Sequence, residues 1–233
     1  MQLLTNSLLL GLGAAVGNQL TMRIAYRKQP HPMPHQFAAL LDHPLRLRYR
    51  DPIETLGMFG LASGMTVLDL GCGTGLFTVE LARMVGTTGV VHAVDLQAPM
   101  VAHTQARVTA AQQAATGLAS VHCHHCPAHQ LPLESNSVDL ALLVATFSQL
   151  VDKRTVLNEL RRVLKPGARL AVSEELPDPA YLPSTAVRPI IEAAGFHFHG
   201  GQGTPFCYHQ LYLNTKEANV VEVTATVIST VVG

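Results

Sequence analysis

From Met65 onward, apolar strand-like segments alternate with helix-like segments, and this alternation restricts the fold more than any other feature of the chain. Strands are expected at 66–70, 89–96, 119–126, 137–146, 168–175 and 205–213, and helices at 76–85, 98–115, 152–165 and 184–196. Most of these strands are continuous apolar runs, which is typical of strands buried on both faces. We therefore predict an α/β fold, with a Rossmann-like, doubly wound, mostly parallel seven-stranded sheet and helices on both faces.

The chain has 233 residues, a length that suits one such domain with a short extension. We predict an N-terminal helix and cap at 1–60, the sheet domain at 61–215, and a β-branched tail or extra strand at 216–233. The apolar core of the first segment is shorter than the roughly 20 residues of a membrane span, and it lacks the basic start of a signal peptide. It predicts a helix that packs on the domain or on a second subunit, as in a homodimer. A helix that contacts a membrane surface through residues 1–28 is the alternative.

Charge and cysteine content narrow the class of protein. Lys plus Arg and Asp plus Glu are both 16, so no net field favours nucleic acid, and a nucleic-acid partner is not expected. The four cysteines are too few for a disulfide scaffold in a chain of this size. We expect a cytoplasmic protein, with membrane association through the N-terminal helix as the open alternative.

Three glycines at alternate positions follow the first expected strand: Gly71, Gly73 and Gly75, with Asp69 in front of them. In parallel α/β sheets ligands bind at this end of the strands, and glycines let the backbone approach a ligand closely. The spacing differs from the dinucleotide pattern G-x-G-x-x-G, because Leu76 stands where its third glycine would be. No lysine follows Gly75, as a phosphate-binding P-loop requires. An acid before the loop suits a cationic ligand, such as an amino group or a sulfonium.

A second acid, Asp95, ends the second expected strand, 20 residues beyond Gly75. A carboxylate at this point can accept hydrogen bonds from both hydroxyls of a ribose. The two acids around the glycine loop together indicate a nucleoside with a positive, amino-acid-like tail, a description that fits S-adenosylmethionine (SAM). The alternatives are a bare tight turn in an enzyme of another kind and an NAD-dependent oxidoreductase, which Leu76 disfavours.

Residues 64–175 resemble the class I SAM-dependent methyltransferases, and within them the quinone-biosynthesis-like branch of small-molecule enzymes. "GMTVLDLGCGTG" is similar to the first motif of that family and "VHAVDLQAPMV" to the second. "CPAHQLPLESNSVDLALLVATFSQL" resembles the third region, and "LNELRRVLKPGARLAVSE" resembles the helix and strand that close the core. The resemblance covers about half of the chain and is specific for the cofactor, not for the acceptor.

The resemblance implies roles for the matching positions. Asp69 and the loop backbone would hold the methionine end of SAM, and Asp95 would bind the ribose. One position departs from the family, since Pro127 stands where an aspartate often bonds the adenine amino group; His129 is a candidate substitute. The full set of expected cofactor-binding residues is Asp69, Gly71, Cys72, Gly73, Thr74, Gly75, Asp95, Leu96, Ala128, Ala145 and Thr146.

The methyl group of a sulfonium is already activated, so the main task of the protein is to hold donor and acceptor in line, which can be worth roughly 7–11 kcal/mol. A general base is needed only when the acceptor arrives protonated. The catalytic candidates at the strand ends and on the cap are His35, Glu174 and Tyr26, and the substrate-binding candidates are Tyr49, Phe147 and Ser148. For each of them, a surface or packing role is the competing interpretation.

The run "HCHHC" at 122–126 contains Cys123 and Cys126 at C-x-x-C spacing. Structural zinc takes four ligands, and successive side chains on a strand point to opposite faces. We therefore predict a buried strand entering a loop, and no metal site. Arsenic methyltransferases share this fold and use several cysteines; Cys72 would match one, but no cysteine closely follows the fourth strand, so that interpretation ranks low.

The residues and the resemblance together predict a SAM-dependent methyltransferase that acts on a small, hydrophobic acceptor, because the predicted cap is apolar. A catalytically silent SAM-binding sensor or scaffold, which would dimerise through its tail, is the alternative. Turnover of SAM to S-adenosylhomocysteine separates the two.

Overall fold

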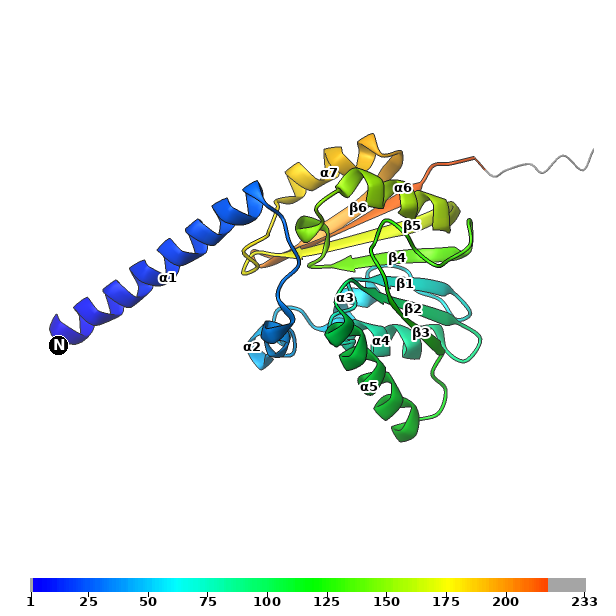
Figure 1. Cartoon of the computed structure of the whole chain (residues 1–233), viewed down its shortest axis with the longest axis horizontal. Helices are drawn as coiled ribbons and strands as arrows, with labels where there is room; N and C mark the ends of the chain where they lie inside the picture. The colour runs from blue at the N-terminus through cyan, green and yellow to red at the C-terminus, as the bar shows by residue number, and fades with distance from the viewer. Residues whose placement is uncertain (1, 218–233) are drawn as a thin grey trace, which may run out of the picture.

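The computed structural model describes residues 2–217 and contains one sheet of seven strands in the order β3-β2-β1-β4-β5-β7-β6 (Figure 1). The strands are β1 (Thr66–Leu70), β2 (Val90–Asp95), β3 (Ser120–His125), β4 (Val138–Val144), β5 (Leu164–Glu175), β6 (Phe196–Gly203) and β7 (Cys207–Asn214). The first five strands run parallel, and β7 is antiparallel to both β5 and β6. The predicted fold class, a mostly parallel Rossmann-like sheet, is confirmed.

Helices cover both faces of the sheet. The helices are α1 (Gln2–Lys28), η1 (His35–Leu40), α2 (Pro44–Leu47), α3 (Pro52–Gly57), α4 (Leu76–Val85), α5 (Ala98–Ala114), η2 (Phe147–Gln149), α6 (Lys153–Val163) and α7 (Ser184–Ala193). Val67 packs with α3 and α4 in one core, whereas its neighbour Leu68 packs with α6 and α7 in the other. This division follows from the alternation of side chains along a strand.

The edge strand β6 departs from the predicted strand list. We expected a helix up to Phe196 and a seventh strand in the tail, but the seventh strand is Phe196–Gly203. Its second half is rich in glycine, which is depleted in strands, so composition conceals it. Gly201 and Gly203 are needed there, since a Cβ on either would lie 2.9 Å from a carbonyl oxygen of β7. Most of the predicted tail, residues 218–233, lies outside the described residues.

The boundary between α6 and β5 also differs from the prediction. Pro166 and Gly167 were expected to stop a helix, but α6 ends at Val163 and β5 begins at Leu164. The pairing register of β4 and β5 shifts between Val138 and Leu140, opposite this segment. Such an irregularity lets a strand include a proline, which has no N–H to donate to its neighbour.

The N-terminal segment forms a helix that projects away from the sheet, followed by a cap of η1, α2 and α3 (Figure 1). After α1, the cap therefore consists of three short helices within residues 35–57. The C-terminal half of α1 reaches the domain, where Gln19 Nε2 donates to the carbonyl of Pro177 at 2.9 Å and the ring of Tyr26 is buried. No helix within residues 2–217 has both the length and the apolar run that a bilayer crossing requires.

Candidate functional site

A cavity of about 1050 Å³ lies at the carboxyl ends of the parallel strands, between the sheet and the cap. Its floor comes from the loop after β1 and the ends of β2, β4 and β5. Its roof comes from α1, the connector after it, η1 and α2. This is the edge of a parallel sheet at which ligands bind, and the volume is typical of a small-molecule site.

The glycine loop has the geometry of a cradle. Gly71 and Gly73 adopt φ values of 77° and 57°, a region that disfavours other residues. A Cβ on Gly71 would lie 2.4 Å from Oγ1 of Thr146, and one on Gly73 would lie 3.0 Å from Leu41. Both glycines line the cavity, as do Cys72 and Thr74 between and after them. Bare backbone is therefore required here for both conformation and space.

The third glycine has a different place. Gly75 precedes α4 in the left-handed conformation, and a Cβ on it would lie 2.9 Å from Cα of Thr104 on α5. It is not among the residues that line the cavity. Its role in the structure is to let α4 begin close to α5.

Asp95 joins the end of β2 to the glycine loop. Its Oδ2 accepts a hydrogen bond from the backbone N–H of Gly73 at 3.1 Å, and its Oδ1 accepts one from Gln97 at 2.9 Å. Burial raises the pKa of this carboxyl, and the backbone hydrogen bonds act in the opposite direction. Each carboxylate oxygen can accept a further hydrogen bond, so Asp95 remains able to hold two hydroxyls.

Asp69 is buried beneath the loop at the end of β1, with an exposed fraction of 2%. Its Oδ2 accepts a hydrogen bond from Thr78 Oγ1 at 2.6 Å, and its Oδ1 has no partner among residues 2–217. Burial raises the pKa of Asp69 to about 6. A nearby cation would favour the ionised form, so this position suits a positively charged group of a ligand.

The other expected cofactor-binding residues also line the cavity. Ala145 holds a φ of 51°, unusual for a residue other than glycine, and its N–H donates to Ser173 at 2.7 Å. Backbone strain of this kind is concentrated at functional sites. His129 lines the same cavity beside Pro127. The predicted cofactor-binding residues that line the cavity are Asp69, Gly71, Cys72, Gly73, Thr74, Asp95, Leu96, Ala128, Ala145 and Thr146.

These residues fit the chemistry of SAM. The glycine loop leaves no side chain between its backbone and a ligand. The Asp69 carboxylate has a free oxygen for a cationic group, and the Asp95 carboxylate can accept hydrogen bonds from hydroxyls. The side chains of Leu96 and Ala128 supply apolar surface near Asp95. The same arrangement is a poor fit for a pyrophosphate, because both acids would repel it.

Of the six catalytic and substrate-binding candidates, two line the cavity and four do not. Tyr26 and Tyr49, both from the N-terminal cap, line the cavity. His35 does not; its backbone N–H donates to the side chain of Gln97 at 3.1 Å. Phe147 is fully buried in the core beneath α6.

Glu174 and Ser148 contact each other instead of the cavity. Ser148 Oγ donates to Glu174 Oε2 at 2.6 Å, and both side chains are buried. Burial raises the pKa of Glu174 to about 7. Because successive strand residues face opposite sides, it is the next residue, Glu175, that lines the cavity.

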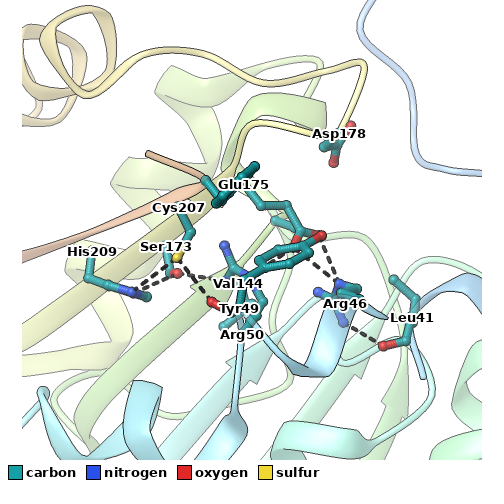
Figure 2. Close-up of polar contacts among 12 residues, drawn as sticks. Leu41, Arg46, Tyr49, Arg50, Val144, Ser173, Glu175, Asp178, Cys207 and His209 are labelled. Carbon is teal, nitrogen blue, oxygen red and sulfur yellow. Dashed lines mark hydrogen bonds and ion pairs between the residues drawn. The ribbon is translucent and has the colours of Figure 1, made fainter. Parts of the chain in front are cut away.

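Two further polar pairs lie on the cavity wall, and neither pairing was predicted. Arg46 Nε donates to Glu175 at 2.9 Å, and Gln149 Nε2 donates to Asp178 at 3.0 Å; all four side chains line the cavity (Figure 2 shows the first pair). The spacing of Arg46 and Arg50 on consecutive turns was the available sequence signal for this wall. It points to a partner acid but does not identify which one.

The histidine and cysteine run behaves as a strand. His122 and His124 share one face with His92 of β2, and Nδ1 of His92 lies 3.1 Å from Nε2 of His124. Burial and the neighbouring His124 lower the pKa of His92 to about 4. Within residues 2–217 no group of three or more histidine, cysteine or acidic residues is arranged to hold a metal ion.

The chain is similar to known proteins in both sequence and structure. A family profile described as "Methyltransferase domain" matches residues 68–172. The chain is 40% identical over 121 residues to demethylmenaquinone methyltransferase of Lactiplantibacillus plantarum. The aligned segment covers 52% of this chain and 49% of that protein. It is 38% identical over 115 residues to 2-phytyl-1,4-naphtoquinone methyltransferase of Trichormus variabilis, 48% of each protein. The chain thus spans about half the length of the curated relatives that it matches.

A solved structure extends the similarity beyond this segment. The crystal structure of a SAM-dependent methyltransferase from Aquifex aeolicus superimposes with a TM-score of 0.73 and 31% sequence identity. The match covers 78% of this chain and 100% of that one. Sequence and structure comparisons therefore lead to the same family.

Proposed function

The chain belongs to the class I SAM-dependent methyltransferases, in the quinone-biosynthesis-like branch, and we propose that it transfers a methyl group from SAM to a small, hydrophobic, hydroquinone-like aromatic acceptor. The observation that carries this proposal is that the glycine loop with its two acids and a set of largely apolar walls belong to the same cavity. The names of the relatives, which are enzymes for demethylmenaquinone and phytyl-naphthoquinone, support an acceptor of this class.

SAM supplies an activated methyl group when bound, and the chain would hold it in place. The Asp69 carboxylate would receive its amino group, and the loop N–H groups its carboxylate. Asp95 would hold the ribose, with Leu96 against the adenine. Thr146, at the end of β4, lies beside Gly71 and closes the cradle on the side of the acceptor.

The rest of the cavity suits an apolar molecule. Its apolar wall residues from the cap and from the loop after β4 are Met22, Met33, Phe37, Leu40, Leu41, Leu45, Leu150 and Val151. Burial of apolar surface is worth about 25 cal/mol per Å², so such walls favour a fused aromatic ring or a hydrocarbon tail over a polar substrate. Holding this ring in line with the methyl group is the main catalytic contribution that we expect from the protein.

A direct assay tests the function. The full chain is incubated with SAM and either a reduced naphthoquinone or a polar catechol, and S-adenosylhomocysteine is measured. We expect turnover with the naphthohydroquinone and a kcat/KM at least about 10-fold lower with the catechol. Binding of S-adenosylhomocysteine without any turnover would instead support the sensor or scaffold alternative, which the comparisons do not favour.

We also propose that the open side of the cap contacts a membrane surface, from which an oily acceptor could enter. Val16, Leu20 and Ile24 of α1 are exposed at 62%, 59% and 50%, and Phe37 and Leu45 add 53% and 64% near the cavity. An amphipathic surface helix binds lipid through such side chains. A flotation assay with anionic vesicles should carry the wild-type protein upward and leave a Leu20→Glu/Ile24→Glu variant behind. Equal flotation of both proteins would contradict the membrane contact.

A further inference from the structure

A group of charged side chains lines the cavity between the end of β5 and the cap. Glu175, at the end of β5, lies between two arginines of the cap (Figure 2). Arg46 Nε is 2.9 Å from Oε1 of Glu175, and Arg50 Nε is 2.9 Å from Oε2. Two positive charges thus face one negative charge.

Arg46 is held rigidly and still has donors to offer. Its Nε donates to Glu175 and its Nη1 donates to the carbonyl of Leu41. Nη2 has no hydrogen-bond partner among residues 2–217, and the side chain lines the cavity. A guanidinium that is fixed at two points and open at the third is preorganised to bind an oxygen anion.

Arg50 supports this arrangement from behind. Its side chain is 1% exposed, and Nη1 donates to Ser173 Oγ at 2.7 Å. Oγ of Ser173 in turn lies 2.9 Å from Nδ1 of His209. Burial and the charge of Arg50 lower the pKa of His209 to about 4, which keeps it neutral. Arg50 is thus held by Ser173 on one side and by Glu175 on the other.

Asp178 lies in the same cavity, on the loop after β5. Its Oδ1 accepts from the N–H of Ala180 at 2.7 Å and its Oδ2 accepts from Gln149 at 3.0 Å. Burial, and then the charge of Glu175, raise the pKa of Asp178, while Arg46 and the hydrogen bonds oppose this. A carboxylate held in this way can take a proton from a ligand without moving.

We propose that Arg46 and Asp178 form the acceptor-activating site: Asp178 removes the proton of an aromatic hydroxyl, and Arg46 Nη2 holds the oxygen anion that results. The acceptor O–H bond breaks, an O–H bond forms on Asp178, and the negative charge moves from the carboxylate to the acceptor oxygen. An electron pair of the phenolate, on the oxygen or on a ring carbon conjugated with it, then forms the new bond to the methyl carbon, and the pair of the broken methyl–sulfur bond stays on sulfur. Where the ring carbon is the nucleophile, its proton leaves to water and the ring becomes aromatic again. The ligand class is a phenol or hydroquinone.

This assignment rests on the proposed function, so its first test measures binding without turnover. A 4-nitrophenol with an alkyl tail is titrated by absorbance, which distinguishes phenol from phenolate, in the presence of S-adenosylhomocysteine. We expect the pKa of the bound nitrophenol to lie below that of the free molecule, so that at a fixed intermediate pH its phenolate fraction rises. In Arg46→Met the shift should vanish. In Arg48→Met, which removes an exposed arginine of the same segment outside the cavity, it should persist.

The outcomes separate the two proposals. Failure of S-adenosylhomocysteine to bind would contradict the proposed function itself. Normal binding of S-adenosylhomocysteine together with a missing nitrophenol shift, or with a shift that survives in Arg46→Met, would overturn only the acceptor-activating site.

The second test concerns proton removal. Glu174, Tyr49 and His209 also titrate near this site, so the pH–rate profile of naphthohydroquinone methylation is compared between wild type and Asp178→Asn. Wild-type activity should fall as the pH drops through the pKa of Asp178. The variant should lose about 10²–10⁴-fold in kcat and show no such limb, and Asp178→Glu should restore part of both. An unchanged acidic limb in Asp178→Asn would overturn the role of Asp178 as the base.

Discussion

At the scale of single residues, Glu174 and Glu175 show how one position along a strand separates two functions. Glu174 points into the core and bonds Ser148, whereas Glu175 points into the cavity and pairs with two arginines. The two carboxyls are chemically alike, and only the side of β5 on which each lies differs. Ser148 and Gln149 are also neighbours with different surroundings, since Ser148 is buried and Gln149 lines the cavity, but they lie on η2 and not on a strand.

The burial of Glu174 predicts a pH-dependent stability. Its pKa is raised from 4.5 to about 7, so the folded state prefers the protonated carboxyl. The contribution of protonated Glu174 to the stability of the folded state is therefore full below about pH 4.5, and it is lost as the pH rises through about 7. Glu174→Gln keeps a neutral group at every pH. The free energy of unfolding of the variant minus that of wild type should therefore be ~1–3 kcal/mol larger at pH 8 than at pH 5.

Urea denaturation at the two pH values measures this difference. Glu134→Gln, which changes an exposed carboxylate, is the control and should show none. A Glu174→Gln protein with the same pH dependence as wild type would contradict the prediction.

The glycine cradle predicts unequal effects of two identical substitutions. At Gly117 φ is 93° with no atom within 4 Å of a new Cβ, so Gly117→Ala should cost about 1–2 kcal/mol of strain alone. At Gly71 φ is 77° and the new Cβ would meet Thr146 at 2.4 Å. Gly71→Ala should therefore destabilise the protein more and weaken S-adenosylhomocysteine binding by at least about 10-fold. Calorimetry on both variants checks this, and equal binding by the two would contradict it.

At the scale of elements, one of the polar contacts that join the cap to the sheet domain lies beside the glycine loop. Asp42, between η1 and α2, accepts from Thr74 Oγ1 at 3.0 Å and pairs with Arg107 of α5. The helices on either side of it carry the apolar roof of the cavity. We therefore expect that loss of the Asp42 contact changes both the movement of the cap and the access of the acceptor to the cavity.

Asp42→Ala should loosen the cap and leave the domain folded. Since the Asp42 and Arg107 side chains are about one-third exposed, the loss of stability should stay within about 1 kcal/mol. Hydrogen exchange should become faster at residues 35–50, and the KM for the acceptor should rise. Glu192→Ala, which removes an exposed ion pair on α7, is the control. Unchanged exchange in the cap would contradict the role of Asp42.

At the scale of the whole molecule, the N-terminal segment and the carboxyl ends of the parallel strands line the cavity together, with α1 and α2 on the left of the sheet in Figure 1. A ligand that touches both should stabilise the entire fold. At a concentration 100 times its dissociation constant, S-adenosylhomocysteine should add about 2.7 kcal/mol to the free energy of unfolding. In a chain of this size that corresponds to a rise in Tm of roughly 5–10 °C. NADH at the same concentration should leave Tm unchanged, and a larger shift with NADH would contradict the cofactor assignment.

The sequence alone determined the parallel sheet and the place of the two acids and the glycines at the ends of its strands. Apolar periodicity placed the five parallel strands, and Asp69, the glycines and Asp95 follow those strands directly, so their positions in the fold depend only on local structure and strand direction. Edge strand β6 was beyond this reasoning, because glycine-rich segments carry no clear periodic signal.

Only the tertiary structure decided the acceptor side. Arg46 and Glu175 are separated by 129 residues and meet because the cap folds over the end of β5. No local pattern predicts such a meeting, since it depends on how two elements pack. The same holds for which of two adjacent glutamates faces the cavity, because the register of β5 in the finished sheet decides it.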